Sequence, residues 1–152
     1  MLYLKQDFSN VVLMSLLDRT ANSHIGTINW SYLFNFTNDM TKESFTTLAI
    51  VGNDIVTFSG SNDIIIKLKD MQTGTPDNLD GEIKLYPKGY WSYEVYEQES
   101  LTNLAVGALV PFKNIPNTKI EVGKAYVYDN TDEVQYTEHI DTTDTTNYMY
   151  IK

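Results

Sequence analysis

Hydrophobic and polar residues alternate along much of the chain, which is the pattern of β-strands that bury one face. In the segment 29–37 one face carries four large side chains, Trp30, Tyr32, Phe34 and Phe36. In the segment 89–97 Trp91, Tyr93 and Val95 share a face. We therefore predict two central strands, and a structural core that includes Trp30, Phe34, Phe36, Trp91 and Tyr93.

The same alternation predicts further strands over Leu2–Lys5, Val11–Leu17, Ser44–Val51, Ile64–Lys69, Glu82–Tyr86, Lys119–Tyr128 and Asn147–Ile151. Hydrophobicity alone would also allow a short buried helix over Val11–Leu17, but its valines and the preceding Ser-Asn favour a strand. Turn residues such as Asn38-Asp39 and Asp80-Gly81 separate the segments. Short strands at spacings of about 8–12 residues are typical of a β-sandwich or barrel, so we expect an all-β fold.

We expect one β-sandwich domain over residues 1–128 and an acidic, Thr-rich C-terminal extension over 129–152, ending in a strand or attachment peptide. Leu101–Asn117 reads as a long connection between two strands. Connections longer than about 12–15 residues are usually functional or disordered. Because this one is rich in apolar residues, we expect an ordered loop that packs on something.

Composition narrows the classes of partner. The chain has no cysteine, which excludes disulfides and thiolate metal sites and indicates a reducing compartment. Its net charge is −9, its pI is near 4.5, and Arg19 is its one arginine. Nucleic acids and anionic membranes both require clustered basic residues. We therefore expect neither of them as a partner, and we find no signal peptide at the N-terminus.

The residues offer little catalytic chemistry. A metal site would have to combine His139 with Glu138 and Asp141, and solvated side chains are the simpler interpretation. The acidic stretch 77–82 lacks the EF-hand spacing for calcium and is more simply a turn that leads into a strand. No nucleophile elbow or phosphate-binding glycine loop is present. We expect no cofactor, no metal, no catalytic residue and no enzymatic activity.

Several tyrosines fall on the strand face opposite the Trp- or Val-bearing positions, namely Tyr90, Tyr96, Tyr126 and Tyr128. Exposed tyrosines are good interface anchors, because the ring is rigid and the hydroxyl stays hydrated. They could equally lie singly on the surface without a role. The sequence leaves both interpretations open.

Three segments resemble small virion structural proteins of tailed Bacteroidetes phages, including crAss-like phages. They are Trp30–Asp39 with its "YLFxFTND" pattern, Gly89–Gln98 with the following Ser100–Leu104 ("GxWxYEVYEQ…NL"), and Glu121–Lys124 ("xxGK"). The resemblance covers about residues 1–128 and does not extend to 129–152.

This resemblance, with the strand pattern, implies an immunoglobulin-like β-sandwich of antiparallel strands. In that arrangement Gly89–Gln98 lies beside Lys119–Tyr128 in one sheet, and Tyr90 takes the place of a tyrosine corner. The resemblance also implies a structural component of a tailed phage virion, made in the host cytoplasm. We expect an auxiliary or decoration protein of the head, or a head–tail connector component, that docks on the major capsid protein or other virion proteins; a homo-oligomer is compatible with this.

Docking would use the loop Leu101–Asn117, an exposed strand edge, and a C-terminal strand added to a partner's sheet. The candidate interface residues are Leu104, Leu109, Phe112, Ile115, Tyr148 and Tyr150. An alternative is a receptor- or carbohydrate-binding module of a tail or head fibre, which the tyrosines and acidic loops would suit. A lysin or glycosidase would need a carboxylate pair about 5–9.5 Å apart in a cleft.

Overall fold

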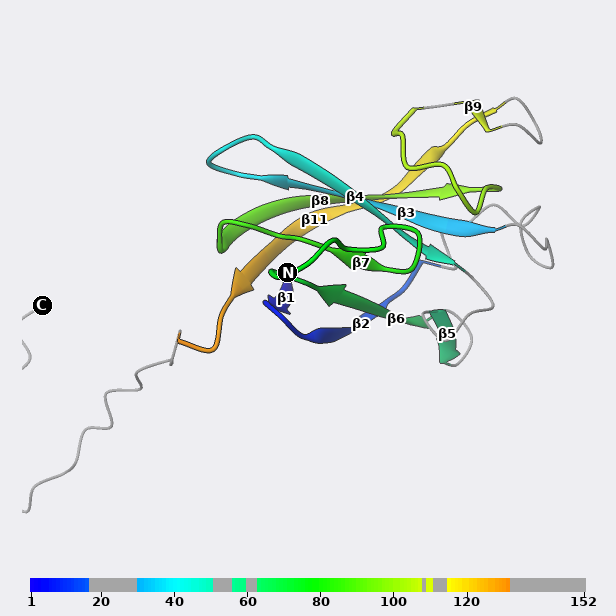
Figure 1. Cartoon of the computed structure of the whole chain (residues 1–152). Coiled ribbons are helices and arrows are strands. Elements are labelled where there is room, and N and C mark those ends of the chain that lie inside the picture. Colours follow the sequence, from blue (N-terminus) through cyan, green and yellow to red (C-terminus); the bar gives the residue numbers. More distant parts are fainter. Residues whose placement is uncertain (17–29, 51–55, 60–62, 108, 111–114, 132–152) are drawn as a thin grey trace, which may run out of the picture.

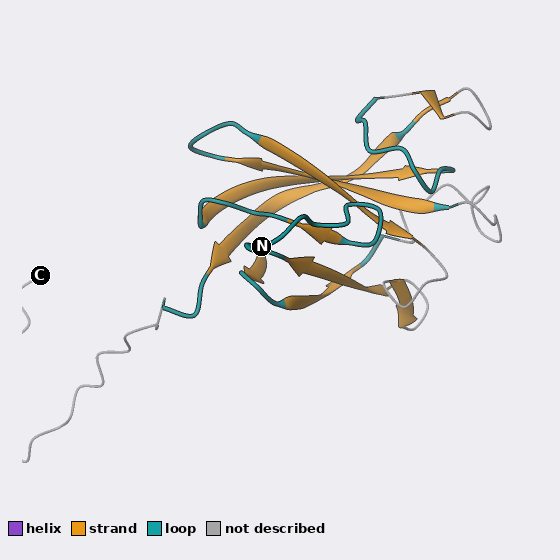
Figure 2. Ribbon diagram, in the orientation of Figure 1, coloured by secondary structure: helices purple, strands orange, loops and turns teal. Residues whose placement is uncertain are grey.

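The computed structural model describes residues 1–16, 30–50, 56–59, 63–107, 109–110 and 115–131. Within these ranges the chain is all-β and contains no helix, as predicted (Figure 2). The strands are β1 (Leu2–Lys5), β2 (Ser9–Met14), β3 (Ser31–Asn38), β4 (Ser44–Ile50), β5 (Val56–Ser59), β6 (Asp63–Asp70), β7 (Glu82–Ile83), β8 (Gly89–Gln98), β9 (Leu109–Val110), β10 (Ile115–Pro116) and β11 (Thr118–Tyr128).

The strands form two main sheets (Figure 1). Sheet A has the order β1-β11-β8-β3-β4 and curls into a half-barrel; β1 runs parallel to β11, and the other neighbours are antiparallel. Sheet B has the order β2-β6-β5, and β7 also pairs with β6. The short strands β9 and β10 form a separate antiparallel ribbon.

Sheet A is centred on the two aromatic strands that the alternation predicts. Strand β3 pairs with β8 over its whole length, from Ser31 opposite Gln98 to Asn38 opposite Trp91. Strand β8 also pairs with β11, which confirms the predicted neighbourhood of Gly89–Gln98 and Lys119–Tyr128. Because side chains alternate across a strand, this register puts the large residues of both strands on one face.

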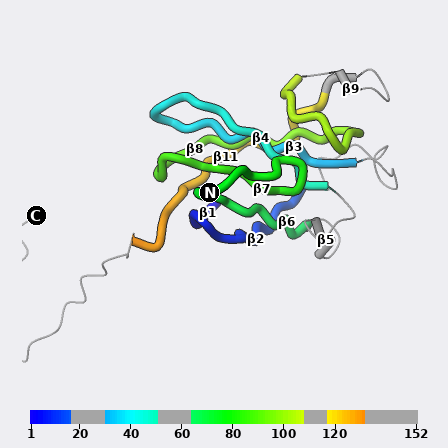
Figure 3. The backbone as a smooth tube through the Cα atoms, in the orientation of Figure 1, coloured from blue at the N-terminus to red at the C-terminus, as the bar shows by residue number. Residues whose placement is uncertain are grey.

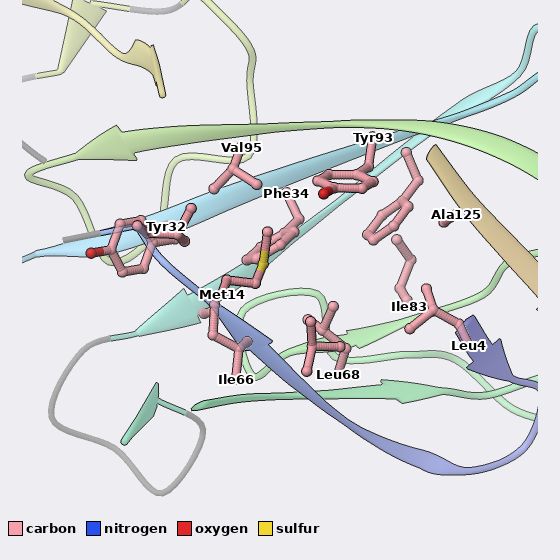
Figure 4. Packing of buried hydrophobic residues seen from close by; sticks show 14 of the residues in the cluster. Leu4, Met14, Tyr32, Phe34, Ile66, Leu68, Ile83, Tyr93, Val95 and Ala125 are labelled. Carbon is pink, nitrogen blue, oxygen red and sulfur yellow. The ribbon is translucent and has the colours of Figure 1, made fainter. Parts of the chain in front are cut away.

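The core fills the space between the two sheets (Figure 4). Sheet A contributes Phe34, Tyr93 and Val95 among others, and sheet B contributes Met14, Ile66 and Leu68. Trp30, Phe36 and Trp91 belong to the same cluster, and Trp91 is fully buried. Burial of side chains of this size contributes about 1.5–3 kcal/mol each, so this cluster is the main stabilising element.

A second, smaller apolar cluster lies on the opposite, outer face of sheet A. It is made of Leu33, Leu48 and Tyr96, with Ile50 and Leu104 packed against them. The alternation places Leu33 and Tyr96 on the outer face correctly, but it suggests exposure for Tyr96, which is only 6% exposed. The reason is that the loop after β8 covers this end of the face through Leu104.

Most strands follow the sequence pattern. The segment after Val11 is a strand, as predicted, since β2 pairs with β6 from Ser9 to Met14. Strand β7 stops at Ile83, because the carbonyl of Leu85 accepts side-chain amides of Gln6 and Gln72 instead of continuing a ladder. The four-residue strand β5 was not predicted. The predicted strand Asn147–Ile151 lies outside the described residues.

The edges of the sheets differ in how they are covered. At the β4 edge, the amide of Leu48 donates to the carbonyl of Asn78, whose side chain donates back to Thr46. Beside β1, the Asn10 side chain accepts from the amide of Lys5 and donates to the carbonyl of the same residue. Strand β2 ends sheet B with one side unpaired by any described strand, and Figure 3 shows it running along the rim of the molecule.

Candidate binding surface

The outer face of sheet A carries a row of three tyrosines on three adjacent strands. Tyr3 of β1 lies opposite Tyr126 of β11, and Tyr126 lies opposite Tyr90 of β8. The ring centroids are 6.5 Å apart for Tyr3 and Tyr126 and 5.0 Å apart for Tyr126 and Tyr90. We call Tyr3, Tyr90 and Tyr126 the tyrosine row.

The two outer rings of the tyrosine row are exposed, Tyr126 between them is half-buried, and contacts between the rings order the row. Tyr3 is 62% exposed and Tyr90 is 59% exposed. Aromatic pairs directly across neighbouring strands stabilise each other and fix the ring orientation. The row therefore presents apolar area at a low cost in side-chain entropy, which is what a protein-binding anchor requires. The exposure of Tyr90 also shows that it is not the tyrosine corner expected from the sequence.

Next to the tyrosine row, a polar cluster ties three segments together. Lys124 of β11 lies 2.7 Å from Asp39, and the Ser92 hydroxyl of β8 donates to the same carboxylate at 2.6 Å. The hydrogen bonds from Lys124 and Ser92 lower the pKa of Asp39. The amide of Asp39 also donates to the carbonyl of Tyr90, so the β3–β4 turn is fastened to β8.

A second polar cluster lies further along the face. Lys119 is 2.7 Å from Glu94, and the Tyr96 hydroxyl donates to Glu94 at 2.8 Å. These contacts lower the pKa of Glu94, chiefly through Lys119, and burial raises the pKa of Tyr96. A β-bulge follows Lys119, beside an open depression of about 240 Å³ lined by residues 119–122. The depression is too open to enclose a small ligand.

The loop after β8 starts from a buried amide network at the other end of the sheet. Gln98, which is 2% exposed, donates to the carbonyl of Asn103 at 2.9 Å and accepts from the side-chain amides of Asn103 and Asn117. Asn117 in turn accepts from the amide of Gly107 at 2.8 Å. The first part of the loop is therefore held to its last residue, and both are held to β8.

The sequence-predicted interface residues are only partly placed. Leu104 is half-buried against the outer cluster of sheet A. Leu109 belongs to β9 and pairs with Pro116, and Ile115 belongs to β10 and pairs with Val110. Phe112, Tyr148 and Tyr150 lie outside the described residues. The role of these six residues at an interface stays a prediction.

Sequence reasoning missed Tyr3 as a surface residue and missed the polar cluster at Asp39. The signal for Tyr3 was weak, because one tyrosine in a four-residue strand does not reveal which strand lies beside it. The parallel pairing of β1 with β11 is what brings it to Tyr126. Tyr90, Tyr126 and Tyr128 were singled out correctly as residues that face away from the core; Tyr90 is exposed, and Tyr126 and Tyr128 are both half-buried.

The acidic stretch 77–82 uses its polar groups to build a turn. The Asp77 carboxylate accepts from the amide of Leu79, and Glu82 accepts from the amide of Asp77 and from Lys69. Gly81 has a φ of 72°, in the left-handed region that favours glycine. Among the residues that the structure describes, no group of three or more His, Asp or Glu side chains could hold a metal ion. His24, His139, Glu138 and Asp141 lie outside them.

Asp70, at the end of β6, is a buried carboxyl group. It is 2% exposed; one oxygen accepts from the Gln72 amide and from the amide of Leu85, and the other has no hydrogen-bond partner. Burial raises its pKa to about 6. The group lies at a corner, where the amide of Asp70 donates to the carbonyl of Phe8. It does not line the outer face of sheet A.

Searches with models of known protein families, against curated proteins and against solved structures found no match to this chain. In the described part of the chain, no helix is long and apolar enough to cross a membrane.

Proposed function

We propose that this chain is a non-enzymatic structural protein of a tailed phage particle, an auxiliary or decoration protein of the head or a head–tail connector component. It docks on the major capsid protein or another virion protein. The observation that carries the docking role is the tyrosine row, an ordered aromatic strip on the outer face of sheet A whose two outer rings, Tyr3 and Tyr90, are exposed. The phage assignment depends on the resemblance in residues 30–39, 89–104 and 121–124.

The three segments that carry the resemblance lie together in the fold, and this supports the phage assignment. They are the three adjacent strands β3, β8 and β11, and their side chains contact one another. Asp39, Ser92 and Lys124 come from the three segments in turn and share one cluster of hydrogen bonds. Gly123 leaves room for the ring of Tyr93, since an added Cβ would lie within 2.7 Å of three atoms of that side chain. These contacts between the three segments give a structural reason for them to occur together in one sequence.

We also propose that the fold is an immunoglobulin-like sandwich. The strand order supports this: β2-β6-β5 corresponds to the B-E-D strands of such a domain, and β11-β8-β3-β4 corresponds to G-F-C-C′. The loop between β8 and β11 is then the F–G loop at one end of the sandwich, a position that immunoglobulin domains use for binding. Its anchored base at Gln98 suits that use.

The docking role is tested by quantifying the chain in purified phage particles. Host cells supply the chain with Tyr90→Ala and Tyr126→Ala together, or with Tyr86→Ala, in place of the normal copy. Tyr86 is 66% exposed but lies outside the tyrosine row, so it controls for the loss of an exposed ring. Removing two anchor residues is expected to lower occupancy by about tenfold or more, because anchors of this kind each contribute about 2 kcal/mol or more. Equal occupancy for both variants would exclude docking through this row.

A carbohydrate-binding module remains the second candidate, because exposed rings lie beside the polar groups of Ser92 and Asp39. The geometry favours it less, since neighbouring rings are inclined at 57° and 66° and form no flat stacking platform. A glycan array separates the two functions. Binding that is lost with Tyr90→Ala would support the carbohydrate role, and no binding at millimolar glycan would remove it.

A further inference from the structure

Strand β2 offers a free edge on sheet B. It pairs with β6 on one side and with no described strand on the other. Val11 and Leu13, which point away from the core, are 67% and 62% exposed, and the neighbouring Phe8 is 56% exposed. A free edge with apolar residues is a template for pairing with another strand.

Within the described residues, side chains or loops partly cover both edges of sheet A. Asn78 covers the β4 edge through its backbone and its side chain, and Asn10 covers the inner edge of β1. An immunoglobulin-type sheet of this class commonly has a fourth strand beside B, in the sequence A-B-E-D. Here the described strands leave that place beside β2 empty. The edge therefore accepts one added strand without displacing anything in the described fold.

A segment of the same chain has the composition of such a strand. Residues 147–151 read Asn-Tyr-Met-Tyr-Ile, with no proline or glycine. In an extended conformation Tyr148 and Tyr150 share one face, and Met149 and Ile151 share the other. Beside β2 one of these faces would cover Val11 and Leu13, and the other would lie at the rim of the core next to Val12 and Met14. Both faces of an added strand must be apolar there, and both are.

We propose that residues 147–151 of a second copy of this chain add to the β2 edge as a further strand of sheet B, so that the protein assembles with itself. The linker between Thr131 and Asn147 explains why the donor is a second copy. It has fifteen residues, 132–146, which span up to about 50 Å when extended. It carries five acidic residues and no lysine or arginine, and like charges extend a linker.

The competing arrangement is pairing with β2 of the same molecule. The carbonyl of Tyr128 accepts from the amide of Gln6, close to the start of β2, so the molecule's own β2 is near. Pairing in the same molecule would require the fifteen linker residues, whose acidic side chains repel one another, to fold back. The resulting loop would be longer than most connections between strands. Reaching a neighbour lets the linker stay extended. Lys67 of β6, directly opposite Val11 in the register of β2 and β6, offers a positive charge one strand away from the receiving edge.

Sedimentation of the full chain over a range of concentrations tests this assembly, and it requires no phage particle, so its outcome is independent of the proposed function. The first variant carries Tyr148→Pro and Met149→Pro, which removes ladder N–H groups in either register. The second carries Leu13→Lys at the receiving edge. The matched control carries Met40→Lys, an apolar residue that is 88% exposed in the β3–β4 turn.

We expect the normal chain and Met40→Lys to associate equally as concentration rises, Leu13→Lys to associate at least tenfold more weakly, and the proline variant to stay monomeric. A synthetic peptide of residues 145–152 added to the proline variant should shift the amide NMR signals of Ser9–Met14. The proposal is overturned if the normal chain stays monomeric at millimolar concentration, if the proline variant still associates, or if the peptide leaves the β2 signals unchanged. A monomer whose β2 signals depend on its own residues 147–151 overturns it as well, in favour of pairing within one molecule.

Discussion

Asp70 illustrates at the residue scale how burial couples this fold to pH. Its carboxyl group has a pKa of about 6 in the folded chain, against 3.8 as the ordinary value, because burial disfavours the charged form. The folded state therefore binds this proton more tightly than the unfolded state. The resulting contribution to stability is fully present below pH 3.8 and is lost as the pH rises through about 6.

We predict that Asp70→Asn removes this dependence. Between pH 5 and pH 7.5 the normal chain should lose about 1 kcal/mol of unfolding free energy through Asp70. The variant should lose that much less, because an amide oxygen can still accept from Gln72 and Leu85 without ionising. Urea unfolding at the two pH values measures the difference. Asp80→Asn, at an exposed carboxyl in the 77–82 turn, is the control. Identical pH dependence in the normal chain and Asp70→Asn would contradict this assignment.

At position 123 the neighbouring ring of Tyr93 leaves room only for glycine. A Cβ there would come within 2.5 Å of the Tyr93 hydroxyl oxygen and within 2.7 Å of two ring atoms. Tyr93 is only 6% exposed and packs on Phe36, so its ring has little room to move.

We predict that Gly123→Ala destabilises the fold by about 1–3 kcal/mol, the usual cost of overpacking a core. In a Tyr93→Leu background the same change should cost much less, since the ring that it meets is gone. A double-mutant cycle from denaturant unfolding provides the coupling energy between the two sites. Additive effects of the two changes would show that the crowding is not the cause.

At the scale of elements, the loop after β8 is defined by its anchors. The side chain of Gln98 joins Asn103 and Asn117, which lie on the two sides of the loop, and Leu104 packs on the outer face of sheet A. These hydrogen bonds are buried, so breaking them leaves polar groups with no protein or water partner.

We predict that Gln98→Met, which keeps the volume of the side chain but removes its amide, loosens the first part of the loop. Backbone amides of residues 101–107 should exchange with solvent about ten times faster or more, in line with the 1–3 kcal/mol cost of an unsatisfied buried polar group. Hydrogen exchange followed by mass spectrometry reports this. Gln6→Met, at a half-buried amide that donates to the carbonyl of Leu85, should leave the 101–107 segment unchanged. Equal protection of 101–107 in Gln98→Met would mean that other contacts hold the loop.

The elements show where sequence alone succeeds and where it stops. A period of two is a local property, so it revealed β3, β8 and β11 and the side on which each large residue lies. It does not reveal what covers a face, which is why Tyr96 was expected at the surface and is found buried under its neighbours. It also does not reveal strand partners, which is why the tyrosine row required the parallel pairing of β1 with β11. The end of β7 depended on the side chains of Gln6 and Gln72, which are distant in sequence.

At the scale of the whole molecule, the outer face of sheet A has two distinct ends. Strands β3 and β8 are antiparallel, with Asn38 opposite Trp91 and Ser31 opposite Gln98. The tyrosine row therefore lies at the end of the β3–β4 turn, and the anchored loop lies at the opposite end, as Figure 1 shows. The two polar clusters at Asp39 and Glu94 lie between them. Both ends face the same side, so a single large partner can contact them together.

This arrangement separates the residues that build the fold from those that can bind. The three segments on which the proposed phage assignment depends supply central strands, most of a buried amide network and the turn fastened through Asp39. The tyrosine row uses Tyr90 from one of those segments but takes Tyr126 and Tyr3 from outside them. We therefore expect the choice of partner to depend partly on residues outside the three motif segments.

The most direct test of the docking account is a reconstruction of the assembled phage particle at a resolution that shows side chains. The account predicts that the chain is present and that another virion protein covers Tyr3, Tyr90 and Tyr126. A particle that lacks the chain, or that contains it with these three rings facing solvent, would contradict the account.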